Sequence, residues 1–186
     1  MFILAITPGT GFEAARWKAV LGSGIDGLMI REKQLEAGPL LDLARRVHDL
    51  APHLELWVNG RLDVALAAGC GLHAPEAYPD IPSGLLPLSR PIHSGDQLGS
   101  RMDCRQLLLG PVFPVPEKGL PWGIKRLHQT LDEIPPGPRI LALGGITPTN
   151  SAPLRHPRLD GIALIRALMK SPEPDRVVDA FRQAWA

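Results

Sequence analysis

Short apolar runs alternate along the chain with segments whose apolar residues recur at helical spacing. The first run is FILAI (2–6), and a segment of helical character (11–24) follows it. The next run is GLMI (27–30), after which five apolar residues recur with a period close to 3.6, namely Leu40, Leu43, Ala44, Val47 and Leu50. Repetition of this strand-then-helix pattern predicts a parallel sheet with helices outside it.

Eight such apolar runs are present: FILAI (2–6), GLMI (27–30), LELWV (54–58), GLHA (71–74), LLPLS (85–89), RQLLLG (105–110), RILALGG (139–145) and GIALI (161–165). Helical segments are expected after most of them, at 61–69, 94–102, 124–134, 147–156 and 166–170, with a closing helix over 177–185. Eight units predict a single closed (β/α)₈ TIM barrel with parallel strands. An open, doubly wound sheet is the alternative, because the fourth and fifth units are brief.

Composition narrows the class of protein. The chain has 186 residues, which suits one domain over 1–186. Its net charge is +1, from 20 Lys+Arg and 19 Asp+Glu, so no overall field attracts nucleic acid or an anionic membrane. The apolar start (1–10) is too short to span a bilayer and has no basic leader. Two cysteines without CxxC spacing predict reduced thiols, hence a cytoplasmic protein.

Polar residues follow the apolar runs repeatedly. The carboxyl ends of parallel barrel strands meet at one mouth, where active sites of this architecture lie. The residues expected there are Thr7, Arg31, Glu32, Lys33, Asn59, Arg61, His73, His93, Ser94, Gly110, Gly144, Gly145 and Arg166. The triplet 31–33 directly follows a buried run, and the alternatives for it are an ion-paired structural role or a solvated rim. For His73 and His93, a hydrogen-bonded structural role stands beside proton transfer.

Two further segments indicate an anion site. In LALGGITPTN (141–150), the glycine backbone and a helix start at Thr147 and Pro148 would form a phosphate cradle. The alternative is that the glycines simply end a strand. In GPVFPVPEKG (110–119), a proline-stiffened loop would hold Lys118 over the mouth, although a solvated lysine is the alternative.

With these residues in view, the chain resembles the thiamin phosphate synthase/TenI family nearly from end to end. IREK (30–33) resembles its QLREK motif, LWVNGRLDVAL (56–66) its INDRxDLAL motif, and GLHAPEAYPD (71–80) its GVHLGQxDxP motif. The remaining matches are IHS (92–94) to SVHS, LLLGPVFPVPEKG (107–119) to DYVxxGPxFPTxSK, LALGGITPTN (141–150) to AIGGIxxxN, and GIALIRAL (161–168) to GVAVVSAI.

The resemblance implies one of two reactions. The synthase joins a pyrimidine pyrophosphate to a thiazole phosphate and holds Mg²⁺ with two aspartates, whose positions here are Gly60 and Tyr78. Neither residue is a suitable ligand for a hard cation. The VNGR sequence at the third strand matches the TenI branch, so the resemblance favours a metal-independent thiazole tautomerase-like isomerase. Glu117, where the family has a polar neutral residue, also disfavours pyrophosphate chemistry.

The resemblance also implies roles for individual residues. The phosphate would meet Gly144, Gly145, Ile165 and Arg166, and the rest of a small phosphorylated thiazole-type ligand would meet Arg31, Lys33, Asn59 and Lys118. The histidine that some TenI-type tautomerases carry after the sixth strand is Pro111 here, so His93 and His73 are the candidate catalytic residues. Neither cofactor nor protein-held metal is expected.

Two alternatives stay open. The first is a divergent synthase whose Mg²⁺ is carried by substrate phosphates and by Glu32 or Glu76. The second is a non-catalytic ligand-binding or regulatory protein. The resemblance also suggests a homodimer, a point that the sequence does not decide.

Overall fold

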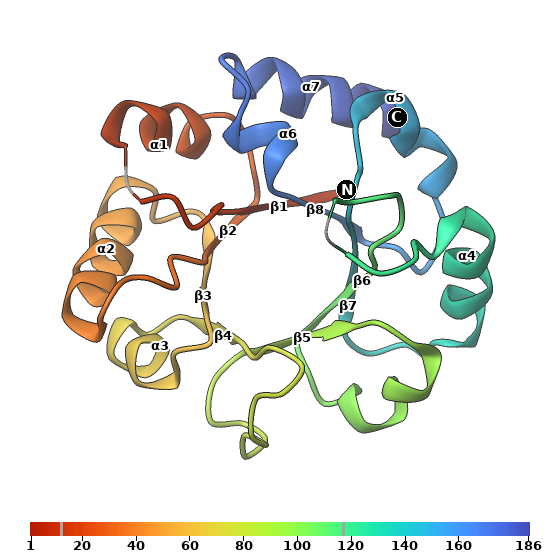
Figure 1. Ribbon diagram of the computed structural model, residues 1–186, viewed down its shortest axis with the longest axis horizontal. Coiled ribbons are helices and arrows are strands. Elements are labelled where there is room, and N and C mark those ends of the chain that lie inside the picture. Colours follow the sequence, from red (N-terminus) through yellow and green to blue (C-terminus); the bar gives the residue numbers. More distant parts are fainter. Residues whose placement is uncertain (12, 117) are drawn as a thin grey trace.

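The computed structural model describes residues 1–186 except for the placement of 12 and 117 and the side chain of 14. Eight parallel strands pair in chain order and close into a barrel in which the last strand pairs with the first (Figure 1). The strands are β1 (Phe2–Ile6), β2 (Gly27–Ile30), β3 (Glu55–Asn59), β4 (Gly71–His73), β5 (Leu88–Ile92), β6 (Gln106–Leu109), β7 (Arg139–Leu143) and β8 (Gly161–Leu164). The predicted (β/α)₈ barrel is confirmed, and the open sheet is wrong.

Helices surround the barrel (Figure 1). They are α1 (Ala14–Leu21), α2 (Ala37–Leu50), α3 (Leu62–Ala68), α4 (Gly123–Glu133), α5 (Pro148–Ser151), α6 (Arg166–Met169) and α7 (Pro174–Trp185), with 3₁₀ turns η1 (Gly95–Gln97), η2 (Gly99–Arg101) and η3 (Ala152–Leu154). The helix expected over 94–102 is wrong, because glycines open both 3₁₀ turns there and weaken a continuous helix. In the described chain, no helix is long and apolar enough to cross a membrane.

The fifth strand begins three residues later than the sequence pattern indicated. Pro87 has no N–H to give to a ladder, and the N–H of Leu85 bonds back to the carbonyl of Pro82 in a turn. The strand therefore begins at Leu88 rather than Leu85. The strand also ends three residues later than the pattern indicated, at Ile92, so His93 directly follows it.

The interior of the barrel is a small apolar core separate from the larger core under the helices. Its buried members are Leu4, Ile6, Met29, Trp57, Leu108, Leu141 and Ala163. Trp57 is the largest of them, and a Cβ on Gly71 would lie 2.4 Å from its Cε3 atom. Glycine on β4 thus makes room for the indole, as the alternation of large and small side chains in a narrow barrel requires. Side chains fill the middle of the barrel, so any ligand lies at an end.

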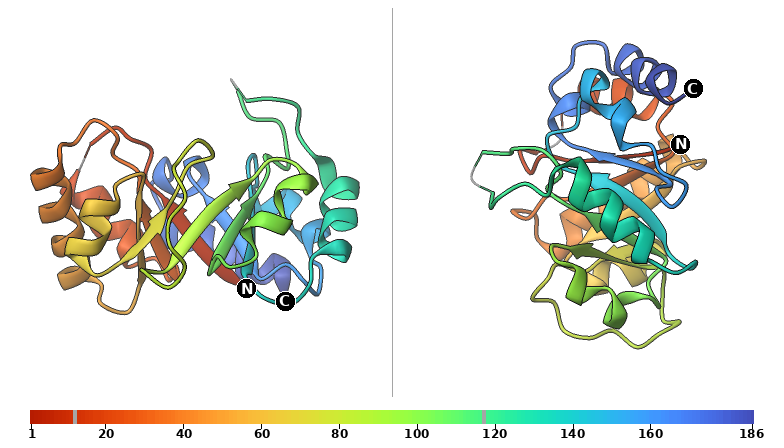
Figure 2. Two further views of the ribbon diagram at one scale, coloured as in Figure 1. Left: turned by 90° about the horizontal axis from the view of Figure 1, so that it is seen from below. Right: turned by 90° about the vertical axis from the view of Figure 1, so that its right-hand side faces the viewer.

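The two ends of the barrel differ in shape. The segment between β6 and α4 extends beyond the strand ends on one side, and both chain termini lie toward the other (Figure 2). The extended segment lies at the carboxyl ends of the strands, which is where the sequence predicted a site.

Candidate functional site

A cavity of about 780 Å³ opens at the carboxyl end of the barrel. Its floor is apolar and includes Leu108, Leu143 and Ala163, which belong to or pack against the core inside the barrel. Gly110, which was expected at the mouth, lines it, and so do seven of the residues that were given a binding or catalytic role: Arg31, His93, Lys118, Gly144, Gly145, Ile165 and Arg166. Lys33, Asn59 and His73 do not. The structure thus brings together residues that follow β2, β5, β6, β7 and β8, and the cavity leaves out those from β3 and β4.

The charged triplet after β2 separates into three directions. Arg31 lines the cavity, and its backbone N–H donates to Thr7 Oγ1 at 2.8 Å. Glu32 is buried, and its carboxylate accepts the N–H groups of Gly9 at 3.2 Å and Gly11 at 2.8 Å. Lys33 is exposed. One residue of the triplet faces the cavity, therefore, while its neighbour fastens the loop after β1.

The two candidate histidines occupy different surroundings. His93 lines the cavity, and its Nδ1 lies 2.8 Å from the carbonyl oxygen of Gly110. A carbonyl only accepts, so Nδ1 carries the proton of the neutral ring and Nε2 is left as a proton acceptor. His73 is buried, and its Nδ1 lies 2.9 Å from Ser89 Oγ. Burial lowers the pKa of His73 to about 3, and the charge of Arg90 acts in the same direction. Of the two, His93 has the position for proton transfer, because it lines the cavity and His73 does not.

The two glycines after β7 are needed for close backbone packing, apart from any role in binding a phosphate. A Cβ on Gly144 would lie 2.6 Å from Pro111 Cβ, and one on Gly145 would lie 2.7 Å from Phe113 Cβ. The segment after β6 packs this closely because the N–H groups of Val112 and Phe113 donate to Leu143 and Gly144 carbonyls. Glycine is therefore required here whether or not a phosphate binds.

The backbone at this edge nevertheless presents free donors. Within the described residues, the N–H groups of Gly144, Gly145, Ile165 and Arg166 donate to no backbone carbonyl. The predicted helix start is confirmed next to them, since α5 is capped by Thr147 and has Pro148 as its first residue. Unpartnered N–H groups beside cations suit an anion.

Lys170 also lines the cavity and was missed by the sequence reasoning. It lies four residues after Arg166, which is the first residue of the short helix α6, and it directly follows that helix. Residues spaced by four share a helix face, so extending the helical pattern past the eighth strand would have found it. Glu117, which the sequence suggested would add negative charge at the mouth, lies outside the described residues.

The corner of the mouth formed by β3 and β4 does not fit a hard cation. The hydroxyl of Tyr78 accepts the N–H of Leu62 at 3.3 Å, and Gly60 offers no side chain. The nearby carboxylate of Asp63 is held by Arg61 at 2.6 Å. Among the residues that the structure describes, no group of three or more His, Cys, Asp and Glu side chains could hold a metal ion. Magnesium prefers several oxygen ligands, carboxylates above all, and in the described part of this corner the carboxylate of Asp63 is already paired.

The alternative magnesium ligands that the sequence offered are also engaged. The Glu32 carboxylate accepts from Gln34 Nε2 at 2.8 Å in addition to its two backbone donors. Glu76 accepts a hydrogen bond from Gln97, and its other oxygen lies 3.9 Å from His93 Nε2. Neither carboxylate is among the residues that line the cavity.

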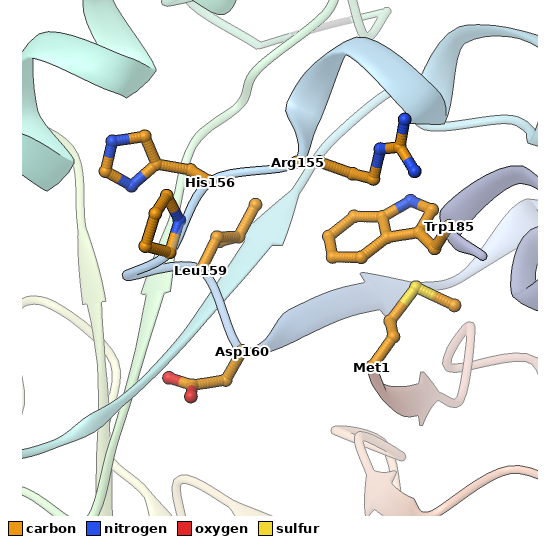
Figure 3. Close-up of a pocket in the computed structure, with 7 residues that line it drawn as sticks. Met1, Arg155, His156, Leu159, Asp160 and Trp185 are labelled. Carbon is orange, nitrogen blue, oxygen red and sulfur yellow. The ribbon is translucent and has the colours of Figure 1, made fainter.

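A second hollow, of about 370 Å³, lies at the amino end of the barrel (Figure 3). Met1 and the indole of Trp185 form one side of it, and Arg155, His156 and Asp160 lie around the rest. Asp160 is committed to the fold, because its Oδ2 accepts the Ile140 N–H at 2.7 Å. This hollow mixes charges of both signs and contains none of the predicted site residues.

The known proteins with similar sequences carry closely related names. No protein-family model matches the chain. A putative thiamine-phosphate synthase of Geobacter sulfurreducens is 33% identical over 171 residues, which cover 84% of this chain and 79% of that protein. A thiamine-phosphate synthase of Thermus thermophilus is 28% identical over 195 residues, covering 95% of this chain and 91% of that protein.

Solved structures with similar folds are more varied in name. A thiamine phosphate pyrophosphorylase from Pyrococcus furiosus superposes with a TM-score of 0.85 at 20% identity, covering 98% of this chain and 94% of that one. An orotidine 5'-phosphate decarboxylase from Pyrococcus horikoshii superposes with a TM-score of 0.73 at 14% identity, covering 97% and 98%. At these identities the superpositions establish the barrel fold alone, since one fold carries many reactions.

Proposed function

The chain belongs to the thiamine-phosphate synthase family, and we propose that the cavity at the carboxyl end of its barrel binds a small phosphorylated thiazole-type ligand of thiamin biosynthesis. Of the two reactions that the sequence raised, the relatives favour the transferase over the isomerase, because they are named thiamine-phosphate synthases. The sequence had favoured the isomerase, so the comparisons reverse that preference.

The cavity itself carries the proposal. Backbone donors at Gly144, Gly145 and Ile165 lie along one edge of it, and the side chains of Arg31 and Arg166 line it together with them. Donors and cations around an apolar floor suit a ring that bears a phosphate. A volume of about 780 Å³ lies in the range of roughly 300–1,000 Å³ typical of ligand pockets, which leaves room for two small substrates at once.

In the joining reaction that the resemblance implies, pyrophosphate leaves as the pyrimidine is transferred to the thiazole. The family uses Mg²⁺ to support that departure, and the residues of this chain at the corresponding corner do not fit the ion. We therefore derive no step through a metal. The work left to the chain is to bind both anionic substrates, to orient them over the floor and to exclude water.

The metal-independent isomerase is the second candidate, and the geometry of His93 favours it. Proton movement on a carboxythiazole phosphate needs a phosphate anchor, a cation for the carboxylate and a general acid or base. The Gly110 carbonyl fixes the His93 tautomer, so Nε2 would exchange the proton, while Arg31 or Lys118 would meet the carboxylate.

One sample distinguishes the candidates. Purified protein would be assayed for thiamin phosphate formation from the pyrimidine pyrophosphate and the thiazole phosphate, in Mg²⁺ and in EDTA, and then for isomerisation of the carboxythiazole phosphate. Formation of thiamin phosphate supports the transferase, and isomerisation alone, lost in His93→Asn but kept in His48→Asn, supports the isomerase. Binding of the thiazole phosphate without either reaction favours a non-catalytic ligand-binding protein. Absence of binding would overturn the proposal as a whole.

A further inference from the structure

We propose that this cavity binds a diphosphate group directly through protein cations, with Arg166 and Lys170 in the part that a divalent metal would otherwise play. The inference rests on the proposed function only in taking the same cavity as the ligand site. In this proposal the guanidinium of Arg166 binds the diphosphate, and Lys170 is added as a second residue that binds it. The ligand class is a pyrophosphate or a pyrophosphate ester.

The first support is the charge of the cavity wall. Four cationic side chains line it, those of Arg31, Lys118, Arg166 and Lys170, and no Asp or Glu of the described residues does. The chain as a whole carries a net charge of only +1, so this concentration of one sign is local. Like charges above an apolar floor repel one another, and the walls focus their field, so an anion with several charges would relieve the repulsion.

The second support is that these charges are available. Within the described residues, none of the four cations forms an ion pair. Two acidic groups at this end of the barrel are instead occupied by other partners. Glu32 is bonded to the loop after β1, and Asp63 is paired with Arg61.

The third support is the arrangement of the cations around the floor. Arg166 and Lys170 come from the segment after β8, beside the free backbone donors of Gly144 and Gly145. Arg31 comes from the end of β2, and Lys118 from the segment after β6. A diphosphate has two phosphoryl groups and would contact cations from more than one of these elements. The planar guanidinium of an arginine suits two phosphate oxygens, while a lysine acts as a point charge.

The corner formed by β3 and β4 shows where the metal function would have been lost. Arg90 holds the loop after β4 by donating to the carbonyls of Tyr78 at 3.3 Å and Pro79 at 3.0 Å. Tyr78 in turn accepts from the first residue of α3. This corner is tied into the fold, whereas the charge that would neutralise a diphosphate lies on other elements.

The test uses inorganic pyrophosphate as the probe. Calorimetric titration of the full chain in EDTA should show binding, and added NaCl should weaken it because exposed charges are screened. Arg166→Ala and Lys170→Ala should each weaken pyrophosphate binding by about tenfold, in line with the loss of a charge-assisted contact. Lys125→Ala, an exposed lysine of α4 outside the cavity lining, is the matched control and should leave affinity unchanged. Circular dichroism would establish that all the variants are folded.

Each outcome decides for or against the inference. Pyrophosphate binding that requires Mg²⁺, or that falls equally in Lys125→Ala, would overturn it, as would a complete lack of binding. Its failure is distinguishable from failure of the proposed function. Pyrophosphate binding in EDTA without formation of thiamin phosphate would support the inference and overturn the transferase. Mg²⁺-dependent formation of thiamin phosphate without pyrophosphate binding in EDTA would support the transferase and overturn the inference.

Discussion

Several charged side chains at the amino end of the barrel are paired with one another, whereas the four cations that line the carboxyl-end cavity have no acidic partner among the described residues. Glu55 accepts from Arg139 at 2.7 and 2.8 Å, and Arg105 lies 3.5 Å from the same carboxylate. Asp26 is likewise paired with Arg182 at 3.1 Å. These amino-end pairs serve the stability of the barrel, and the four cations of the cavity are free to serve a ligand. Substitutions at the two ends should therefore have separate effects.

The largest effect is expected from Gly161→Ala at the amino end. A Cβ there would lie 1.9 Å from the carbonyl oxygen of Phe2, a backbone atom that cannot move aside without breaking the pairing of β8 with β1. We expect a loss of about 3 kcal/mol or more in the free energy of unfolding, measured by urea denaturation. Gly38→Ala in α2, where the new Cβ has open space, is the control and should be neutral or slightly stabilising. Equal stability of the two variants would contradict the account.

Acid should destabilise the protein through His73. Its pKa is about 3 in the fold because of burial, against about 6.5 in the unfolded chain, so the unfolded chain holds the proton more tightly. The stabilising effect of a neutral His73 is complete above pH 6.5 and is lost as the pH falls toward 3, at about 1.4 kcal/mol per pH unit. Urea denaturation between pH 7 and 5 should show a shallower dependence in His73→Gln. A His73 resonance that titrates near pH 6.5 in the folded protein would rule this out.

Removal of the Glu55 carboxylate should lower the stability of the fold without changing the affinity for ligand. Arg139 lowers the pKa of Glu55 through its hydrogen bonds, and in Glu55→Ala this partly buried guanidinium would lose its partner. We expect a loss of about 1–3 kcal/mol in the free energy of unfolding, with affinity for thiazole phosphate unchanged. Glu133→Ala, at an exposed position in α4, should change stability by less than about 0.5 kcal/mol. A change in affinity in Glu55→Ala would show that the two ends are coupled.

The smallest effect concerns the charged triplet after β2. Arg31→Ala should weaken thiazole phosphate binding by about tenfold, or ~1.4 kcal/mol, because Arg31 lines the cavity. Lys33→Ala is the matched control and should leave binding unchanged, since Lys33 is exposed and outside the cavity lining. Calorimetry on both variants provides the measurement. Equal losses of affinity in the two variants would mean that the triplet acts through its overall charge and not through the one side chain that lines the cavity.

The comparison of the two ends also explains what the sequence could predict. Periodicity was sufficient for the barrel, because each buried strand reads as an apolar run, and parallel strands place the following residues at one end. The fifth strand was the exception, since Pro87 and Pro91 interrupt its pattern and hid its start. The pattern also could not show that Arg31, Glu32 and Lys33 have different surroundings. Those surroundings depend on the loop after β1, whose backbone N–H groups Glu32 binds.

The amino end was not predicted at all, although it carries a sequence signal. Asp-Gly precedes an apolar run twice, at 26–27 and at 160–161. In both places the aspartate accepts an N–H from the preceding neighbour strand, Ile3 in one case and Ile140 in the other, at 2.7 Å. The pairs are indistinguishable from ordinary turns until the strands are placed side by side. Residues that act through long-range backbone contacts therefore stay hidden in a single sequence.

The most direct test of the central claim follows backbone amide resonances of glycines at both ends while thiazole phosphate is added. Gly144 and Gly145 would report on the cavity, and Gly27, Gly71 and Gly161 would report on strand positions away from its lining. We predict that the first pair shifts in a saturable manner, in EDTA as well as in Mg²⁺, while the other three stay in place. Shifts confined to Gly27, Gly71 and Gly161, or no shifts at either end, would contradict the assignment of the carboxyl-end cavity as the ligand site.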